Sequence, residues 1–378
     1  MNALPPAEVL APYAGVIGVT AMAALLVSLV IVFTRHLHGP LSMDHPGSVQ
    51  AVHIHPTPRI GGVGIYLGLL LAWLLLPEGE ASDMLGLLVL AGLPAWGFGL
   101  AEDLTKRVGV LPRLLATMFS GALACLISGV ALTRLDVPLL DFVLTWWPAA
   151  VVFTAFAVGG VANAINIIDG FHGLASGTSI LAFCALAVLA LLAGDIPLAA
   201  VCLLAAASVV GFWLVNYPWG KLFMGDGGAY FTGFVLAWLA VLLPMRNPEI
   251  SPWASLMVCA YPFIEALYSM LRRRIERRSL GQPDSEHLHS LLASQFVRKH
   301  FTPLSHAQQN AAVAPFIWLF VAGMVLMAIQ FRESTNLLVF SLLLTTLCYH
   351  FSYRFLVRQV KTPGPATALP ATLQKHRL

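Results

Sequence analysis

Long apolar stretches separated by short polar segments follow one another along this chain of 378 residues. A helix needs about 20 mostly apolar residues to cross a bilayer. By that criterion the pattern predicts about eleven transmembrane helices. Their expected ranges are 12–34, 60–76, 84–101, 111–132, 140–158, 177–193, 197–215, 227–244, 252–271, 312–330 and 335–353. The range 140–158 is the least regular, because Asp141 and Pro148 interrupt it.

Composition agrees with a membrane protein. Hydrophobic residues make up 58% of the chain and charged residues 10%, against about 25% charged in soluble domains. The first apolar stretch has no basic segment before it and no small-residue cleavage site, so it is expected to stay as an anchor. We therefore predict an all-α polytopic membrane protein with one integral-membrane domain over 1–361. The Pro- and Ala-containing segment 362–378 is predicted to be a disordered tail.

Basic residues predict the orientation of the helices. Alternate loops, together with the C-terminal tail, hold 18 of the 21 Lys and Arg residues, and the opposite loops hold only Arg134, Arg246 and Arg332. The positive-inside rule places the richer set in the cytoplasm. An odd number of spans then puts the N-terminus in the periplasm and the C-terminus in the cytoplasm. Every polar motif described below falls on the cytoplasmic side.

The segment 163–173, Asn-Ala-Ile-Asn-Ile-Ile-Asp-Gly-Phe-His-Gly, is the most informative of these motifs. Asn163, Asn166 and Asp169 recur every three residues and therefore share one side of a helix end. Gly170 and Gly173 are expected to end the helix and let the backbone approach a ligand. Polar side chains are costly near hydrocarbon, so this pattern favours a functional site.

A second motif lies before the range 60–76. It reads His53-Ile-His55-Pro-Thr-Pro-Arg59-Ile-Gly-Gly62. Arg59 offers a planar fork for phosphate, and the following helix start offers amide N–H groups. The alternative is a Pro/Gly turn with an interfacial arginine. Five histidines lie between His36 and His55, but no cysteine accompanies them and their spacing matches no zinc site.

A third motif follows the range 84–101, where Glu102 and Asp103 are followed by Lys106 and Arg107. The acids suit a divalent cation or proton transfer, and the bases suit phosphate oxygens. An ordinary charged loop explains the same pattern.

A fourth motif places Asp226 between glycines at the start of an apolar helix. An aspartate there can cap the backbone amides of the helix. It can also bind Mg²⁺, which needs only one or two carboxylates when substrate phosphates and waters complete its shell. Both interpretations stay open.

The longest inner loop carries an arginine run and then His287-Leu-His289. The arginines suit anionic lipid headgroups. Imidazoles at alternating positions can bind phosphate or ribose, or shuttle a proton. Glu265, near the inner end of the range 252–271, is either functional or paired with an arginine.

Together these five motifs resemble, in order, those of the polyprenyl-phosphate N-acetylhexosamine-1-phosphate transferases. The resemblance is carried by Pro56–Gly62, by Glu102-Asp103 with Lys106, by 163–173, by Phe223–Asp226 and by His287-x-His289. It implies an enzyme that transfers sugar 1-phosphate from a UDP-N-acetylhexosamine to undecaprenyl phosphate and releases UMP. Such an enzyme would act at the inner face of the bacterial cytoplasmic membrane and start a cell-surface polysaccharide.

The resemblance also implies residue roles. Asp226 would be the principal ligand of Mg²⁺, with Mn²⁺ as an alternative, and the Asn166 carbonyl would help. Asp103, with Glu102 beside it, would act on the lipid phosphate as a base or an orienting group, and Asp169 would contact the nucleotide or the metal environment. The phosphates and the uridine would be held by Arg59, Lys106, Asn163, His172, His287 and His289.

Two positions depart from the family pattern. Glu102 stands where an aspartate is common, and His172 stands at a common acid position. We expect His172 to change donor recognition. The family's muramyl-pentapeptide branch has a richer histidine cluster than His287-x-His289, so the chain resembles the polysaccharide-initiating branch more closely.

The rival functions are a membrane transporter and a non-catalytic scaffold of the same pathway. A transporter would place polar residues at mid-depth in two related halves, and the sequence has no internal repeat. The scaffold is motivated by His172. The lipid bilayer and possible homodimer partners are expected, whereas a nucleic-acid partner is not.

Overall fold

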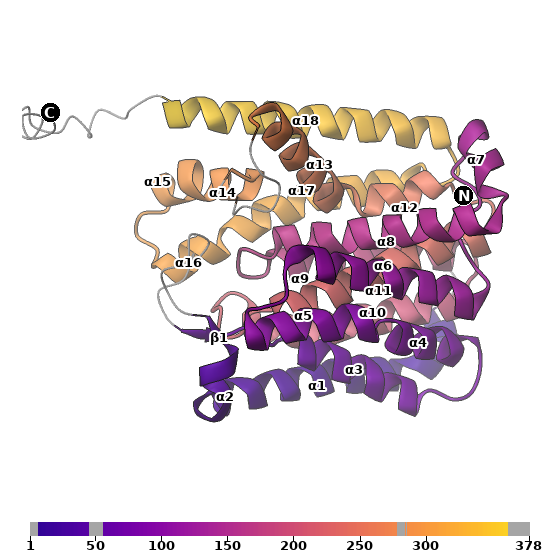
Figure 1. Ribbon diagram of the computed structural model, residues 1–378, viewed down its shortest axis with the longest axis horizontal. Helices are drawn as coiled ribbons and strands as arrows, with labels where there is room; N and C mark the ends of the chain where they lie inside the picture. Colours follow the sequence, from indigo (N-terminus) through magenta and orange to yellow (C-terminus); the bar gives the residue numbers. More distant parts are fainter. Residues whose placement is uncertain (1–6, 45–55, 278–283, 285, 362–378) are drawn as a thin grey trace, which may run out of the picture.

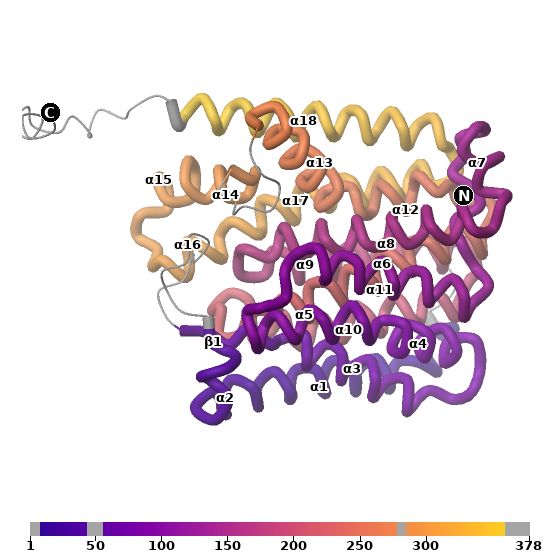
Figure 2. Tube along the Cα trace, viewed as in Figure 1, coloured from indigo at the N-terminus to yellow at the C-terminus, as the bar shows by residue number. Residues whose placement is uncertain are grey.

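The computed structural model describes residues 7–44, 56–277, 284 and 286–361, and these residues form a bundle of helices. Most of the helices run side by side (Figures 1 and 2). The long elements are α1 (Ala11–Phe33), α3 (Gly62–Leu75), α4 (Glu80–Ala91), α5 (Leu93–Thr105), α6 (Val110–Ser128), α8 (Trp147–Ile168), α9 (Leu174–Leu192), α10 (Ile196–Asn216), α11 (Gly225–Arg246), α13 (Ala260–Ile275), α17 (Val313–Gln330) and α18 (Thr335–Lys361).

Shorter elements lie mainly at the two ends of the bundle. These are η1 (Ala7–Leu10), α2 (Arg35–Ser42), α7 (Pro138–Leu144), α12 (Pro252–Val258), α14 (Leu288–Leu292), η2 (Ala293–Val297), α15 (Arg298–His300) and α16 (His306–Ala311). Strands β1 (Met43–Asp44) and β2 (Thr57–Pro58) pair antiparallel, with Met43 opposite Pro58. The histidines of the 53–55 segment lie outside the described residues, as does the tail 362–378.

The predicted all-α membrane fold is confirmed. Within the described residues, eight helices are long and apolar enough to cross a membrane, and the count reaches ten if each of two bent pairs is one span. The expected span 60–76 corresponds to α3, which has only 14 residues and does not meet this criterion. The irregular range 140–158 is replaced by α8, which begins at Trp147 and extends to Ile168.

Both bent pairs contain an expected span. The range 84–101 divides into α4 and α5, which meet at Gly92 with a bend of 41°. A side chain at Gly92 would lie 2.6 Å from the ring of Phe231, so the glycine lets the bend pack against α11. The range 252–271 divides into α12 and α13 with a bend of 76°. As a result, α13 crosses the direction of its neighbours (Figure 1).

Helix α11 is the centre of the bundle. In its most apolar stretch 94% of the residues are buried, against 22% for α1 and for α18. Helices α5 and α8 pack closely on it, and a Cβ at Gly233 would lie 2.5 Å from the backbone of Ala162. The outer helices instead expose large apolar side chains such as Phe33 and Leu319. A bilayer requires an apolar exterior and helices whose backbone polar groups are hydrogen-bonded internally.

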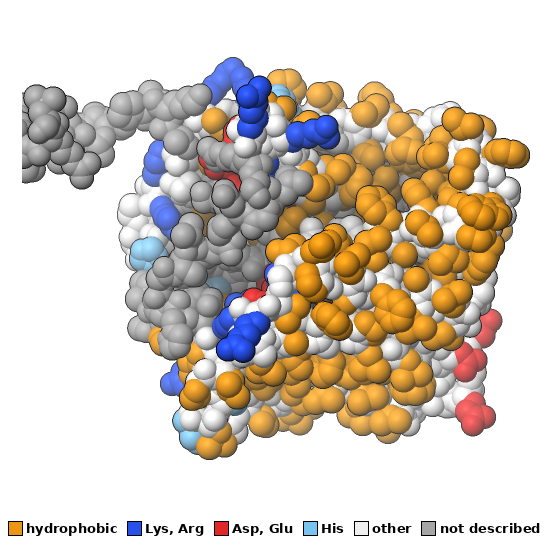
Figure 3. Space-filling view, viewed as in Figure 1, with side chains coloured by type: hydrophobic (Ala, Val, Ile, Leu, Met, Phe, Trp, Pro, Cys, Tyr) orange, Lys and Arg blue, Asp and Glu red, His pale blue; other side chains and the backbone are white. Residues whose placement is uncertain are grey.

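Charge is distributed unevenly along the bundle. Lys and Arg side chains gather at the end that carries α2, α14, α15 and α16, and acidic side chains appear at the opposite edge (Figure 3). A broad apolar surface separates the two ends. We call the basic end the loop end, because the five motifs of the sequence lie there.

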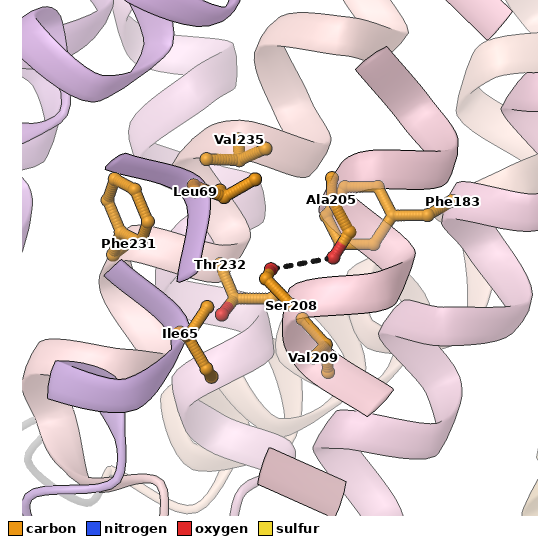
Figure 4. A pocket seen from close by; sticks show the side chains of 9 residues that line it. All are labelled: Ile65, Leu69, Phe183, Ala205, Ser208, Val209, Phe231, Thr232 and Val235. Atoms are coloured by element: carbon orange, nitrogen blue, oxygen red, sulfur yellow. Dashed lines mark hydrogen bonds between the residues drawn. The ribbon is translucent and has the colours of Figure 1, made fainter. Parts of the chain in front are cut away.

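A small packing defect lies within the bundle, away from the polar motifs (Figure 4). It is too small to hold a water molecule and is lined mainly by apolar side chains such as Ile65, Phe183 and Phe231. The Ser208 hydroxyl at its edge donates to the carbonyl oxygen of Ala205. Thr232 is the other hydroxyl residue of the lining, and its buried oxygen has no hydrogen-bond partner among the described residues. The space carries no charged side chain and is a packing feature.

Candidate active site

The proline-glycine motif and the Asp226 motif form a single backbone unit at the loop end. The amide of Phe223 donates to the carbonyl oxygen of Pro58, and the amide of Gly61 donates to the carbonyl oxygen of Phe223, both at 2.9 Å. A Cβ at Gly62 would lie 2.2 Å from the amide nitrogen of Gly228. Glycine is therefore required for this approach of two backbones, and hydrogen bonds join 58–62 to 223–228.

Asp103 is buried and fastens this unit to α5. Its two carboxylate oxygens accept the N–H groups of Asp226 and Gly227, each at 2.9 Å, and Arg59 Nε donates to it at 3.1 Å. These two amides belong to the first turn of α11 and have no partner within the helix. The sequence left open that Asp226 caps the start of α11. Asp103 caps these amides instead, and Met224 occupies the N-cap position.

The Asp226 side chain is left to face other partners. Its Oδ1 accepts a hydrogen bond from Asn166 Nδ2 at 2.9 Å, its Oδ2 pairs with Arg113, and Arg59 Nη2 lies 3.6 Å from Oδ1. The side chain is 11% exposed. The preceding Gly225 has φ +71°, a left-handed conformation that glycine adopts without strain. One carboxylate therefore gathers two guanidinium groups and one carboxamide.

The end of α8 supplies the next wall, as the spacing of Asn163, Asn166 and Asp169 predicted. Helix α8 ends at Ile168, and Asp169 follows as its C-cap. Asn163 Oδ1 accepts a hydrogen bond from the hydroxyl of Tyr230 at 3.1 Å, so that both asparagines contact α11. Burial raises the pKa of Asp169 to about 7, and the positive charge of Arg59 offsets this only in part.

Glu102 and Lys106 lie at the edge of this group. Glu102 Oε2 accepts the amide of Val108 at 2.7 Å and so closes the turn after α5. Lys106 ends α5 with φ +57°. The two adjacent acids of the motif therefore have different surroundings: Asp103 points to α11, and Glu102 points to its own loop.

His172 is buried against the loop that precedes α11. Its backbone amide donates to Asn310 Oδ1 at 2.7 Å, and its Nδ1 lies 3.2 Å from the carbonyl oxygen of Pro218. A Cβ at Gly220 would lie 2.3 Å from the ring. The residue is 5% exposed. This geometry supports a role in holding two loops together, and donor recognition by His172 stays a prediction.

The histidine pair joins the site through an aromatic contact. The rings of His287 and His289 stack, with 5.2 Å between their centroids. The rings of His289 and Phe171 pack edge to face, with 5.5 Å between their centroids. Phe171 lies in the loop between α8 and α9. Burial lowers the pKa of His289, which favours its neutral form.

Sequence reasoning missed several residues that complete the group. Arg113, in the first turns of α6, was counted only as a cytoplasmic charge. It pairs with Asp226 and lies 5.7 Å over the ring of Tyr230. Asn216 accepts the amide of Gly173 and donates to the carbonyl oxygen of Leu222. Its position four residues before the tight turn at Gly220 was the available signal.

The chain brings carboxylates, carboxamides and guanidinium groups to one end of a membrane-embedded bundle. Guanidinium groups and glycine-bordered amides suit phosphate oxygens, and carboxylate and amide oxygens suit a hard divalent cation. Fold and site together define an integral membrane protein built for a phosphorylated substrate.

Comparison with known proteins agrees with that class. The model of glycosyl transferase family 4 matches residues 85–244. A probable undecaprenyl-phosphate N-acetylglucosaminyl 1-phosphate transferase of Bacillus subtilis is 28% identical over 257 residues, which cover 66% of this chain and 69% of that protein. A decaprenyl-phosphate N-acetylglucosaminephosphotransferase of Mycobacterium leprae is 26% identical over 339 residues, 79% of this chain and 81% of that protein.

A third relative is the undecaprenyl-phosphate alpha-N-acetylglucosaminyl 1-phosphate transferase of Escherichia coli K12. It is 25% identical over 275 residues, which cover 71% of this chain and 74% of that protein. The predicted resemblance to the polyprenyl-phosphate N-acetylhexosamine-1-phosphate transferases is confirmed by the family model and by these relatives.

Proposed function

We propose that this protein transfers N-acetylglucosamine 1-phosphate from UDP-N-acetylglucosamine to a polyprenyl phosphate, which we take to be undecaprenyl phosphate. The observation that carries the proposal is the junction at the loop end. There five residues meet from four helices and one loop, namely Arg59, Asp103, Arg113, Asn166 and Asp226. The relatives act on polyprenyl phosphates and N-acetylglucosamine, which fits this donor and acceptor.

In the proposed reaction an oxygen of the polyprenyl phosphate attacks the phosphorus that carries the sugar. The bond from that phosphorus to the bridging oxygen breaks, and the oxygen leaves with its electron pair as part of UMP. The products are UMP and the sugar-diphosphate lipid. Such a transfer asks the protein mainly to position the reactants and to stabilise negative charge. A polyprenyl phosphate is already largely dianionic near neutral pH, by analogy with other phosphate monoesters.

The residues of the site fit a Mg²⁺ ion. In the part of the chain that the structure describes, no cluster of three His, Cys, Asp or Glu side chains could hold a metal on its own. Mg²⁺ needs only one or two carboxylates plus phosphates and waters. Two guanidinium groups already gather at Asp226, which shows that this carboxylate attracts positive charge. Bound there by Asp226 and the Asn166 oxygen, Mg²⁺ would neutralise charge on the donor diphosphate.

The surrounding side chains then receive distinct roles. Arg59, with Arg113, holds phosphate oxygens, and Lys106 provides a further cation beside Asp103. Asp103 keeps Asp226 in place by holding its backbone. Asp169 lies beside Arg59, and burial raises the pKa of its carboxyl to about 7. Asn163 orients Tyr230, over which Arg113 lies. His287 and His289 serve the nucleotide.

We further propose that the loop end faces the cytoplasm of a bacterial inner membrane. The basic residues gather at that end, in agreement with the positive-inside rule (Figure 3). Counting α3 as a short span restores eleven crossings, with a periplasmic N-terminus. A polysaccharide as the final product and a homodimer both stay predictions of the sequence.

The direct test is UMP release by the purified protein in detergent, with UDP-N-acetylglucosamine, undecaprenyl phosphate and Mg²⁺. We expect turnover by the wild type and a loss of at least 100-fold in Asp226→Ala. A matched control is Asp83→Ala, which removes an exposed carboxylate in the first turn of α4. Activity that survives in Asp226→Ala would refute the metal assignment. No UMP from any UDP-N-acetylhexosamine would favour the scaffold function.

A further inference from the structure

Glu265 is a buried carboxylate that the proposed chemistry does not use. It lies in α13, the second half of the bent pair α12–α13, and it is 1% exposed. A buried charge is costly unless it is paired and hydrogen-bonded. The partners of Glu265 therefore indicate what it is for.

Those partners are the histidine motif and not the arginine run. Glu265 Oε1 accepts a hydrogen bond from His287 Nδ1 at 3.0 Å and another from the amide of Leu288 at 3.1 Å. Its Oε2 accepts the hydroxyl of Tyr261 at 3.3 Å and lies 3.7 Å from His289 Nδ1. One carboxylate thus holds both imidazoles and the start of α14. The sequence left open a pairing of Glu265 with an arginine of the run, but Arg272 and Arg273 pair with Asp284.

The contacts continue from the histidines to the loop between α8 and α9. His289 is buried, and its ring meets that of Phe171 edge to face. Phe171 lies two residues after Asp169 and next to His172, whose backbone is tied to Asn310. A path of direct contacts therefore runs from Glu265 in α13 through the histidine pair to Phe171, in the loop that follows the end of α8.

We propose that Glu265 is a positioning residue for the nucleotide half of the donor. Its carboxylate fixes the ring orientation of His287, with Nδ1 as the protonated nitrogen, in the way that carboxylates orient metal-bound histidines. It also braces His289 against Phe171. This inference rests on the proposed function. It adds a residue that touches no substrate and acts from the membrane-embedded part of the chain.

The test measures UMP binding by calorimetry together with steady-state kinetics. Glu265→Gln removes the charge and keeps the size of the side chain. We expect it to weaken UMP binding about tenfold and to raise the KM for UDP-N-acetylglucosamine by a similar factor. The KM for undecaprenyl phosphate should stay within twofold. Glu265→Asp keeps the charge and should restore part of the affinity.

The matched control is Tyr268→Phe. Tyr268 lies on the same helix, but its hydroxyl contacts His350 Nδ1 at 3.1 Å and not the histidine motif. We expect wild-type affinity for UMP. Tyr261→Phe serves if Glu265→Gln fails to fold, because it removes one hydroxyl between Glu265 and His289 and leaves the carboxylate in place. It should weaken UMP binding in the same direction, by a smaller factor.

A double-mutant cycle separates positioning from general destabilisation. If Glu265 acts through the histidines, Glu265→Gln should have no further effect on UMP binding in a His287→Ala/His289→Ala background. Unchanged UMP binding in both Glu265→Gln and Tyr261→Phe, with an active wild type, would overturn this inference alone. A wild type that binds no UMP and releases none would overturn the proposed function.

Discussion

Asp103 illustrates, at the scale of a residue, how a carboxylate can control a site through the backbone. Both of its oxygens are occupied by amides of α11, and the third bond comes from Arg59. Because Asp103 holds the backbone amide of Asp226, it also sets the direction in which the Asp226 side chain points. Loss of activity on substitution of Asp103 is therefore expected even if it never exchanges a proton with the substrate.

Asp103→Asn replaces one acceptor oxygen with an amide group that donates. One of the two α11 amides then has no acceptor, and an unsatisfied buried donor costs about 1–3 kcal/mol. We expect a lower Tm in detergent together with a loss of UMP release. A residue that acted only as a base would lose activity at unchanged Tm, and that result would contradict the capping role.

Glu102→Gln is the internal control for that experiment. Glu102 bonds the amide of Val108 through one oxygen, and glutamine retains a carbonyl oxygen that can accept it. We expect nearly wild-type Tm. Of these adjacent acids, only the one that faces α11 should be sensitive to the loss of an oxygen.

The sequence predicted which polar residues gather, but not how each is used. The spacing of Asn166 and Asp169 was enough to place them on one helix end, and the glycines beside Asp226 indicated an accessible acid. The bonds of Asp103 could not be predicted, because they join residues 123 and 124 positions apart. Arg113 was missed for a similar reason, since a basic residue at a cytoplasmic helix start has an ordinary explanation.

At the scale of elements, glycines set the distances between the parts of the site. Gly62 touches Gly228, and Gly99 faces the backbone of Asp226, where a Cβ would lie 2.6 Å away. Helices α3, α5 and α11 can therefore meet at backbone distance. Side chains at these positions would separate the motifs that carry the chemistry.

Gly62→Ala is expected to force α3 away from the start of α11. Overpacking of this kind costs about 1–3 kcal/mol, and here the obstructing atoms belong to the backbone and cannot rotate away. We expect a lower Tm and a strong loss of UMP release. The control is Gly160→Ala in α8, where a Cβ meets nothing within 4 Å. Equal behaviour of the two variants would refute the close-contact argument.

The element pattern was predicted well where helices are long and apolar. It was less accurate at α3, which has only 14 residues, and at the bent pairs. Hydropathy does not distinguish a straight span from two halves that meet at 76°. That distinction depends on packing partners that only the fold defines.

At the scale of the whole molecule, we expect the distribution of charge to set how the bundle sits in the membrane. The outer face is apolar, the loop end is basic, and α11 lies at the centre (Figure 3). A charged nucleotide and a membrane-bound lipid phosphate can meet only at such an interface. The uneven distribution of basic residues was visible in the sequence, and it needed no contact information.

A reporter fused to the C-terminus tests the orientation. We expect a fluorescent protein that folds only in the cytoplasm to be bright, and alkaline phosphatase, which requires the periplasm, to be inactive. A fusion after Arg134, on the opposite side, should give the reverse. A periplasmic C-terminus would rule out both the eleven-crossing arrangement and a cytoplasmic site.

The bonds of Asp103 to α11 have a consequence for biosynthesis. When α5 enters the membrane, the amides that will satisfy its carboxylate have not yet been translated, because they come more than 120 residues later. Until α11 inserts at the centre of the bundle, the Asp103 carboxylate lacks these two hydrogen-bond donors. Assembly of the site therefore coincides with completion of the core, and a chain interrupted before α11 has neither.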